Sequence, residues 1–71
     1  NGESKILLED ALKKLPAKFS EVIIMKVWGN HTFAQIGEML GVSLNTVASR
    51  YRYGLERLRK ALESTRSNDD I

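Results

Sequence analysis

The hydrophobic positions at the start of the chain follow helical spacing. In the segment SKILLEDALKKLP, Leu8, Ala11, Leu12 and Leu15 recur at i, i+3, i+4 and i+7, which predicts one amphipathic helix. This helix is expected to end before Pro16, because a residue that precedes proline is pushed out of helical geometry. Proline is well suited to the first position of a helix, so a second helix is predicted to begin there.

The second predicted helix, AKFSEVIIMKVW, is apolar on nearly all sides. A helix of this kind is usually buried, so we expect it to be the central element of the fold. Trp28, at its end, is expected either to be half-buried in the core or to form part of a surface for a partner. Gly29 and Asn30 follow, and both residue types tolerate the positive φ that often ends a helix.

Two further helices are predicted from their capping residues. Thr32 and Gln35 have the spacing of a capping box at the start of the short segment FAQIGEML. Gly41 permits a sharp left-handed exit, and Ser43 is the expected N-cap of a long helix that follows. A short helix, a glycine turn and a long helix form a helix-turn-helix. The predicted fold is therefore all-α, a small four-helix domain with a C-terminal helix-turn-helix and a long recognition helix.

The long helix has an apolar side and a polar side. Counted at about 100° per residue, the apolar side is predicted to contain Leu44, Val47, Tyr51, Gly54, Leu55, Leu58, Ala61 and Leu62. The opposite side gathers Asn45, Ser49, Arg52 and Glu56, flanked by Thr46, Ala48, Tyr53, Arg59 and Lys60. Glu56 is expected to pair with Lys60 or Arg52, four residues away. Gly54 in mid-helix is expected to mark close packing against the first or second helix.

Length and composition narrow the class of protein. A chain of 71 residues forms one domain at most, and without cysteine it has neither disulfides nor a cysteine-based zinc site. No apolar run approaches the roughly 20 residues of a membrane helix, so a cytoplasmic protein without membrane insertion is expected. The chain begins with Asn1 rather than methionine, and we expect it to be a piece of a longer protein. Residues 1–66 are predicted to form the domain and 67–71 a polar, disordered tail.

Charge is unevenly distributed along the chain. Residues 43–66 carry six basic and two acidic side chains, whereas residues 1–42 carry five of each. This asymmetry favours a polyanionic partner such as nucleic acid, although a solvated helix face would produce it too. No acid pair, nucleophile with a base, phosphate-binding glycine loop or metal cluster can be assembled, and His31 has no second ligand at a plausible spacing. We therefore expect no enzyme, no cofactor, no catalytic residue and no metal site.

The polar side of the long helix suits a DNA groove. In a helix-turn-helix the second helix enters the major groove with its N-terminal residues against base edges. Small polar side chains there allow close approach, and arginines further along can reach phosphates or guanine edges. Glu56 faces outward among cations, so the segment that enters the groove is expected to end near Tyr53.

The same residues resemble a known family. The order LP, then EV with three apolar residues, then TFAQIGEMLGVSLNTVASRYRYGLERLRKAL is similar to region four of bacterial RNA polymerase sigma factors, particularly the extracytoplasmic-function group. The resemblance covers residues 11–62 without an insertion. It implies recognition of the upstream promoter element, the minus-35 hexamer, during transcription initiation. It also implies docking on the β flap of RNA polymerase core, with an anti-sigma factor as a further partner, and a location in the bacterial nucleoid.

The family pattern assigns roles to residues of the recognition helix. Its base-contacting and backbone-contacting positions fall on Asn45, Thr46, Ala48, Ser49, Arg50 and Tyr53. A basic residue is frequent at the position of Ala48 and arginine is usual at that of Tyr53, so two cationic contacts are missing in this chain, and Arg52 is expected to replace one. The complete set of predicted DNA-binding residues is Thr32, Ser43, Asn45, Thr46, Ala48, Ser49, Arg50, Arg52 and Tyr53.

Two alternatives stay open on the sequence. One is the DNA-binding domain of a LuxR-type response regulator, which shares the pattern EV…IA…L…S…TV but usually lacks the leucine-proline start. The other is a sigma-like protein-interaction module that binds polymerase or an anti-sigma factor without reading DNA. The missing cationic contacts are what keep this second alternative open.

Overall fold

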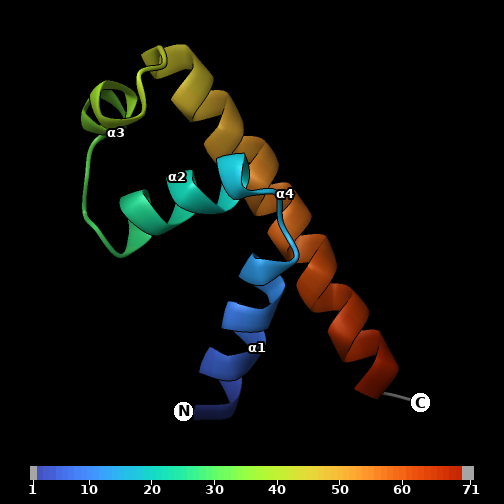
Figure 1. Cartoon of the computed structure of the whole chain (residues 1–71). Coiled ribbons are helices and arrows are strands. Elements are labelled where there is room, and N and C mark those ends of the chain that lie inside the picture. The colour runs from blue at the N-terminus through green and yellow to red at the C-terminus, as the bar shows by residue number, and fades with distance from the viewer. Residues whose placement is uncertain (1, 70–71) are drawn as a thin grey trace.

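The computed structural model describes residues 2–69, with side chains from residue 7 to residue 63. Four helices make up this part of the chain, which confirms the predicted all-α fold: α1 (Gly2–Lys13), α2 (Ala17–Val27), α3 (Phe33–Leu40) and α4 (Leu44–Asp69). Figure 1 shows α4 running the length of the molecule, with the three shorter helices along one side of it. Each of the three packs against α4, so α4 is the element that joins the fold together.

The boundary between α1 and α2 differs from the prediction by one position. Pro16 is the N-cap of α2 and not its first helical residue, because its ψ of 145° is extended. Its carbonyl oxygen accepts hydrogen bonds from the backbone N–H groups of Phe19 and Ser20, at 3.0 and 3.2 Å. Pro16 therefore lies just outside the helix and accepts its first hydrogen bonds, and Ala17 is the first helical residue.

The helix-turn-helix forms as its capping residues predict. Thr32 and Gln35 make the complete capping box of α3, with side-chain to backbone hydrogen bonds of 3.1 and 2.9 Å. Gly41 ends α3 in the left-handed conformation, with φ 71° and ψ 33°. The hydroxyl of Ser43 accepts a hydrogen bond from the backbone N–H of Thr46 at 3.1 Å, which caps the start of α4. The turn between the two helices is thus fixed at both ends.

Two groups of buried side chains hold α4 in place. The first joins α1, α2 and α4 and consists of Ala11, Leu12, Leu15, Phe19, Ile23 and Leu58. The second joins α2, α3 and α4 and consists of Val22, Ile36 and Val47. Tyr51 packs against both groups, and its ring lies 5.4 Å from that of Phe33, so the helix-turn-helix is anchored to the rest of the core.

Several residues predicted to be buried are exposed. Leu44 and Leu55 of α4 are 50% and 38% exposed, because Leu44 begins the helix and Leu55 lies at the margin of the apolar side. Ile24, Val27 and Trp28 are also about half exposed, so the prediction that α2 is the most buried element is wrong for this side of the helix. The reason is that α1 packs mainly against α4 and leaves one side of α2 open. For Trp28 the exposure favours the partner surface over the core.

The predicted tail overlaps the end of α4. This helix continues through Asp69, whereas the tail was expected from residue 67, and residues 70 and 71 lie outside the described residues. The division of the chain into a domain, 1–66, and a tail, 67–71, stays a prediction.

Candidate nucleic-acid interface

The start of α2 and the first turns of α4 together form an open hollow of about 350 Å³. We call it the basic hollow, and its lining residues are Lys18, Phe19, Asn45, Thr46, Ser49, Arg50 and Tyr53. It combines two cationic groups with small hydrogen-bonding side chains, and neither α2 nor α4 has an acidic residue in its first turn. Cationic side chains beside small polar groups suit a nucleic acid, because the cations can bind phosphates while the small polar groups approach the base edges.

The basic hollow brings together five of the nine predicted DNA-binding residues, Asn45, Thr46, Ser49, Arg50 and Tyr53. The other four lie outside it. Thr32 and Ser43 are exposed N-caps of α3 and α4. Ala48 is half-buried, and the guanidinium carbon of Arg52 lies 5.2 Å from the ring centroid of Tyr53. Arg52 thus reaches the interface as a stacked partner of Tyr53.

Lys18 and Phe19 are the lining residues that sequence reasoning missed. Phe19 belongs to the helix that was predicted to be buried, and it is 8% exposed, but it also lines the hollow. Lys18 lies in the first turn of α2, where the helix dipole disfavours a cation. A cation at this unfavourable position was the one sequence signal that Lys18 has a role other than stabilising the helix. Which role it has becomes apparent only in the structure, where α2 lies beside α4 and Lys18 lines the hollow.

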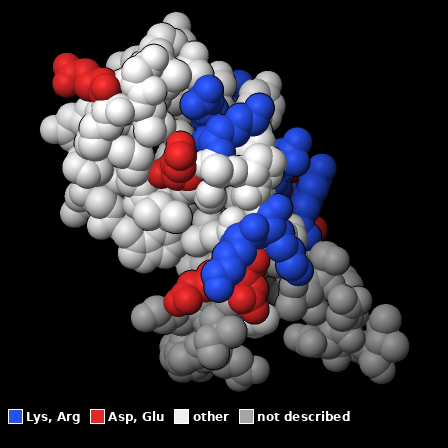
Figure 2. Space-filling model, in the orientation of Figure 1, with Lys and Arg blue, Asp and Glu red and all other residues white. Residues whose placement is uncertain are grey.

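A second hollow, about 610 Å³ in volume, continues along α4 from the first. We call it the distal hollow, and it is lined by Phe19, Tyr53, Glu56, Arg57 and Lys60. Phe19 and Tyr53 line both hollows, so the two form one continuous surface. Figure 2 shows Lys and Arg side chains of the visible face gathered in a band over α4, the start of α2 and the end of α1.

The carboxylate of Glu56 forms its ion pair within its own helix. An Arg59 nitrogen lies 2.6 Å from a Glu56 oxygen, and Arg59 also pairs with Glu63. The partner is therefore Arg59, three residues away, and not Lys60 or Arg52 as predicted, because one guanidinium can bridge both carboxylates. The hydrogen bond from Arg59, followed by its charge, lowers the pKa of Glu56. The same two carboxylates raise the pKa of Arg59.

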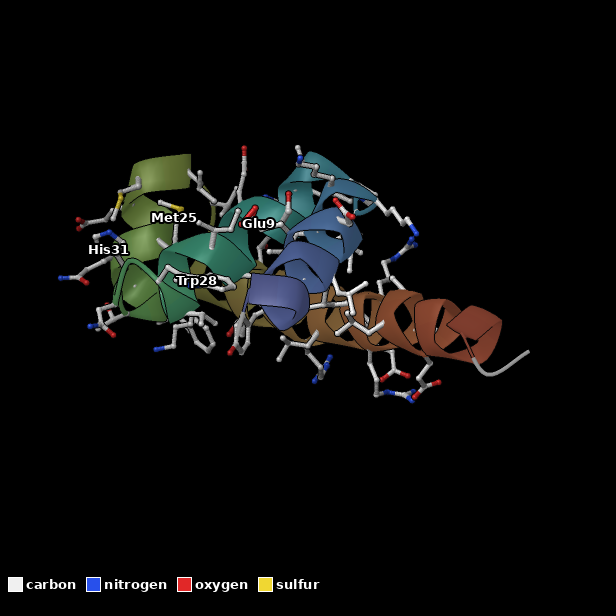
Figure 3. All side chains as sticks on the ribbon, turned by 90° about the horizontal axis from the view of Figure 1, so that it is seen from below. Glu9, Met25, Trp28 and His31 are labelled. Atoms are coloured by element: carbon white, nitrogen blue, oxygen red, sulfur yellow. The ribbon has the colours of Figure 1, made fainter. Side chains whose placement is uncertain are left out.

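The other end of α2 carries an apolar groove of about 230 Å³. Its lining residues are Leu8, Glu9, Leu12, Ile24 and Trp28. Figure 3 shows Glu9 on α1 and Trp28 at the end of α2, with α1 crossing α2 in this view. Trp28 is 56% exposed, and a large aromatic side chain left this open commonly marks a surface for a protein partner.

The described residues were also compared with the requirements of a metal site and of a membrane-spanning helix. Among them no group of three or more His, Cys, Asp or Glu side chains could hold a metal ion. His31 lies in the loop after α2 (Figure 3). Its backbone N–H donates to the backbone carbonyl of Met25 at 3.2 Å. No helix within residues 2–69 combines the length and the apolar character that a membrane crossing needs.

Comparisons with known proteins place this geometry in context. A family model described as sigma-70, region 4, matches residues 11–60. The chain is 36% identical over 55 residues to the ECF RNA polymerase sigma factor SigW of Bacillus subtilis, covering 78% of this chain and 29% of that protein. It is 37% identical over 60 residues to the RNA polymerase sigma-E factor of Streptomyces avermitilis, covering 84% of this chain and 34% of that protein. The chain therefore spans about a third of the length of these relatives. No solved structure matches it.

Proposed function

Because this chain belongs to the sigma-70 region 4 family, we propose that it binds the upstream, minus-35 element of a promoter during transcription initiation. In this role it acts as the DNA-binding part of a sigma factor attached to RNA polymerase, and it catalyses no reaction. Membership of this family also removes the alternative of a LuxR-type response regulator.

The observation that supports DNA binding is the basic hollow. It places Asn45 and Ser49, from the first turns of α4, beside the cationic groups of Lys18 and Arg50. In our proposal the polar pair faces base edges in the major groove, while the cations hold phosphates on either side. The N-terminal part of a recognition helix is the part that reads bases in other helix-turn-helix proteins.

The apolar groove supports a protein partner at the other end of α2. We propose that RNA polymerase core docks there through the β flap, and that an anti-sigma factor competes for the same surface. On α2 the groove is lined by Ile24 and Trp28 and the basic hollow by Lys18 and Phe19, so the nearest lining residues are five positions, or about 7.5 Å of helix, apart. In our proposal the two surfaces take different partners, and DNA and polymerase bind at the same time.

Duplex selection tests the proposal without knowledge of the promoter. The chain is used to select sequences from a pool of random duplexes, and affinities are then measured for a selected duplex and a scrambled one. Asn45→Ala or Ser49→Ala is expected to reduce the preference between the two by about 1 to 3 kcal/mol for each lost contact. Arg50→Gln is expected to weaken binding to both duplexes about equally, because a phosphate contact carries no sequence information.

Lys26→Gln provides the charge-matched control for these variants. Lys26 lies in the last turn of α2, far from Lys18, and its ammonium is 4.9 Å from the ring centroid of Phe33. Its substitution should leave both affinities unchanged. If no sequence is enriched and the chain fails to bind duplex at low salt, the interaction module that does not read DNA becomes the better description.

A further inference from the structure

Three cations lie outside the residues predicted to contact DNA, yet they border the same surface. Lys18 lines the basic hollow, and Arg57 and Lys60 line the distal hollow. We call these three residues the cationic edge. Lys18 belongs to α2, whereas Arg57 and Lys60 belong to α4. Phe19 and Tyr53 line both hollows and so connect the surfaces on which the three cations lie.

The ring of Phe19 positions two of the three cations. The ammonium nitrogen of Lys18 lies 5.2 Å from the ring centroid, and the guanidinium carbon of Arg57 lies 5.0 Å from it. Phe19 is 8% exposed and belongs to the core, so the ring is a fixed support. Cations held on a fixed ring lose less freedom when a ligand binds than cations on free side chains.

The carboxylate in the distal hollow forms its ion pair with Arg59 and not with a member of the cationic edge, although the charge of Lys60 also contributes to the lowered pKa of Glu56. Glu56 is bound by Arg59, which also binds Glu63. Among the side chains of residues 7–63 these are the ion pairs present, so Lys18, Arg57 and Lys60 have no carboxylate within ion-pair distance there. The surface therefore keeps positive charge available for an external anion.

We propose that the cationic edge binds the DNA backbone beyond the element that α4 reads, so that the footprint on the duplex extends past Tyr53 and onto α2. This inference rests on the proposed function. The surface is continuous with the basic hollow, and from Arg50 to Lys60 it follows about 15 Å of helix. A DNA strand presents a phosphate about every 3.4 Å along the duplex axis. Several phosphates of one strand thus lie within reach, and the continuity of this surface with the basic hollow favours DNA over a separate acidic peptide.

The dependence of affinity on salt counts these contacts. Each phosphate contact contributes about 0.9 to the slope of log affinity against log salt. The double variant Lys18→Gln, Lys60→Gln is expected to have a slope less steep by about 1.8, which is two such contacts. The preference for the selected over the scrambled duplex should stay at the wild-type value, because backbone contacts do not read bases.

Two substitutions of Arg57 distinguish the effect of its charge on DNA binding from the effect of its contact with Phe19. Arg57→Gln should remove about another 0.9 from the slope, whereas Arg57→Lys keeps the charge and should keep the slope. Thermal unfolding of each variant shows whether loss of the contact with Phe19 changes the fold, and Lys18 and Lys60 are exposed, so their variants are expected to fold normally. Lys26→Gln again serves as the charge-matched control and should have the wild-type slope.

Failure of this inference can be told apart from failure of the proposed function. If the wild-type chain prefers the selected duplex and the double variant has the same salt slope, the cationic edge does not bind DNA, although the proposed function stands. If the wild-type chain shows no preference among duplexes, the proposed function itself fails. A double variant that keeps the wild-type slope but no longer binds poly-glutamate would assign the edge to an acidic protein partner and overturn the inference.

Discussion

Gly54 of α4 lies so close to Ile23 of α2 that a Cβ atom at position 54 would stand 3.0 Å from Cδ1 of Ile23. It would also stand 3.2 Å from Cβ of Phe19, which cannot move without its helix. The glycine therefore sets the distance between the two helices that form the basic hollow. The sequence predicted this role from the presence of glycine in mid-helix, and the structure confirms that the neighbour is the second helix.

Gly54→Ala is expected to lower the free energy of unfolding by about 1 kcal/mol. Alanine gains about 1 kcal/mol over glycine from helix propensity, but overpacking of a tight core position costs about 1 to 3 kcal/mol. For a domain of this size the loss corresponds to a fall of about 4 to 8 °C in Tm. Thermal unfolding followed by circular dichroism measures it. A rise in Tm would mean that α2 and α4 separate easily.

The capping box of α3 gives a second stability prediction. Thr32→Ala removes the hydroxyl that accepts from the backbone N–H of Gln35, at a cost of about 1 kcal/mol. Thr32→Ser keeps that acceptor and should unfold at nearly the wild-type denaturant concentration. Urea unfolding of the two variants compares them directly. Equal midpoints for Thr32→Ala and the wild type would show that water replaces the cap without loss.

The ion pair of Glu56 with Arg59 makes stability depend on pH. The pKa of Glu56 is lowered, first by the hydrogen bond from Arg59 and then by its charge. A carboxyl pKa that is lowered in the folded state contributes stability above the ordinary carboxyl pKa, and this stability is lost as the pH falls through the lowered value. Glu56→Gln should therefore reduce Tm at neutral pH and make no difference in strong acid.

The size of this effect should depend on salt, because both side chains are more than half exposed and salt screens exposed charges. Melting curves at neutral and acid pH, each in low and high salt, measure it. Glu38→Gln is a suitable control, since Glu38 is exposed and has no ion pair among the described side chains. A difference in Tm between Glu56→Gln and the wild type that grows in acid would contradict the expected direction.

Trp28 is expected to matter for partners more than for folding. Because it is 56% exposed, Trp28→Ala should cost less than about 1 kcal/mol, well below the roughly 3 to 5 kcal/mol of a buried Trp or Phe. Ile23→Ala, at a fully buried position, should cost about 2 to 5 kcal/mol. The proposal for the apolar groove adds that Trp28→Ala weakens binding to polymerase core. A pull-down with purified core measures this, and wild-type binding by Trp28→Ala would place the docking surface elsewhere.

Local signals in the sequence were sufficient for the helix-turn-helix. Its capping box, glycine turn and serine cap depend on residues within four positions of one another, and the structure contains all three. Burial was predicted less well, because it depends on which neighbour covers a face. The pattern around α2 could not show that α1 leaves Ile24 and Trp28 uncovered.

The residues of the candidate interface were likewise predicted only in part, because those outside α4 depend on how the helices pack. A helical projection of α4 placed Asn45 and Ser49 on its polar side, and both line the basic hollow. The same projection could not place Lys18, which lies more than twenty positions earlier in the sequence and reaches the hollow only because Gly54 lets α2 approach α4. That Arg52 contacts DNA stays a prediction, and in the structure its guanidinium carbon lies 5.2 Å from the ring centroid of Tyr53.

The separation of the basic hollow and the apolar groove along α2 has a consequence for affinity. A module anchored on a large assembly through one end experiences any DNA held by that assembly at an effective concentration far above that of free duplex. If the chain binds DNA and polymerase as we propose, a recognition helix that lacks two of the family's cationic contacts would need only weak intrinsic affinity for DNA once the chain is tethered. In the same proposal an untethered chain would dissociate readily from DNA, so promoter binding would be restricted to chains that already carry polymerase.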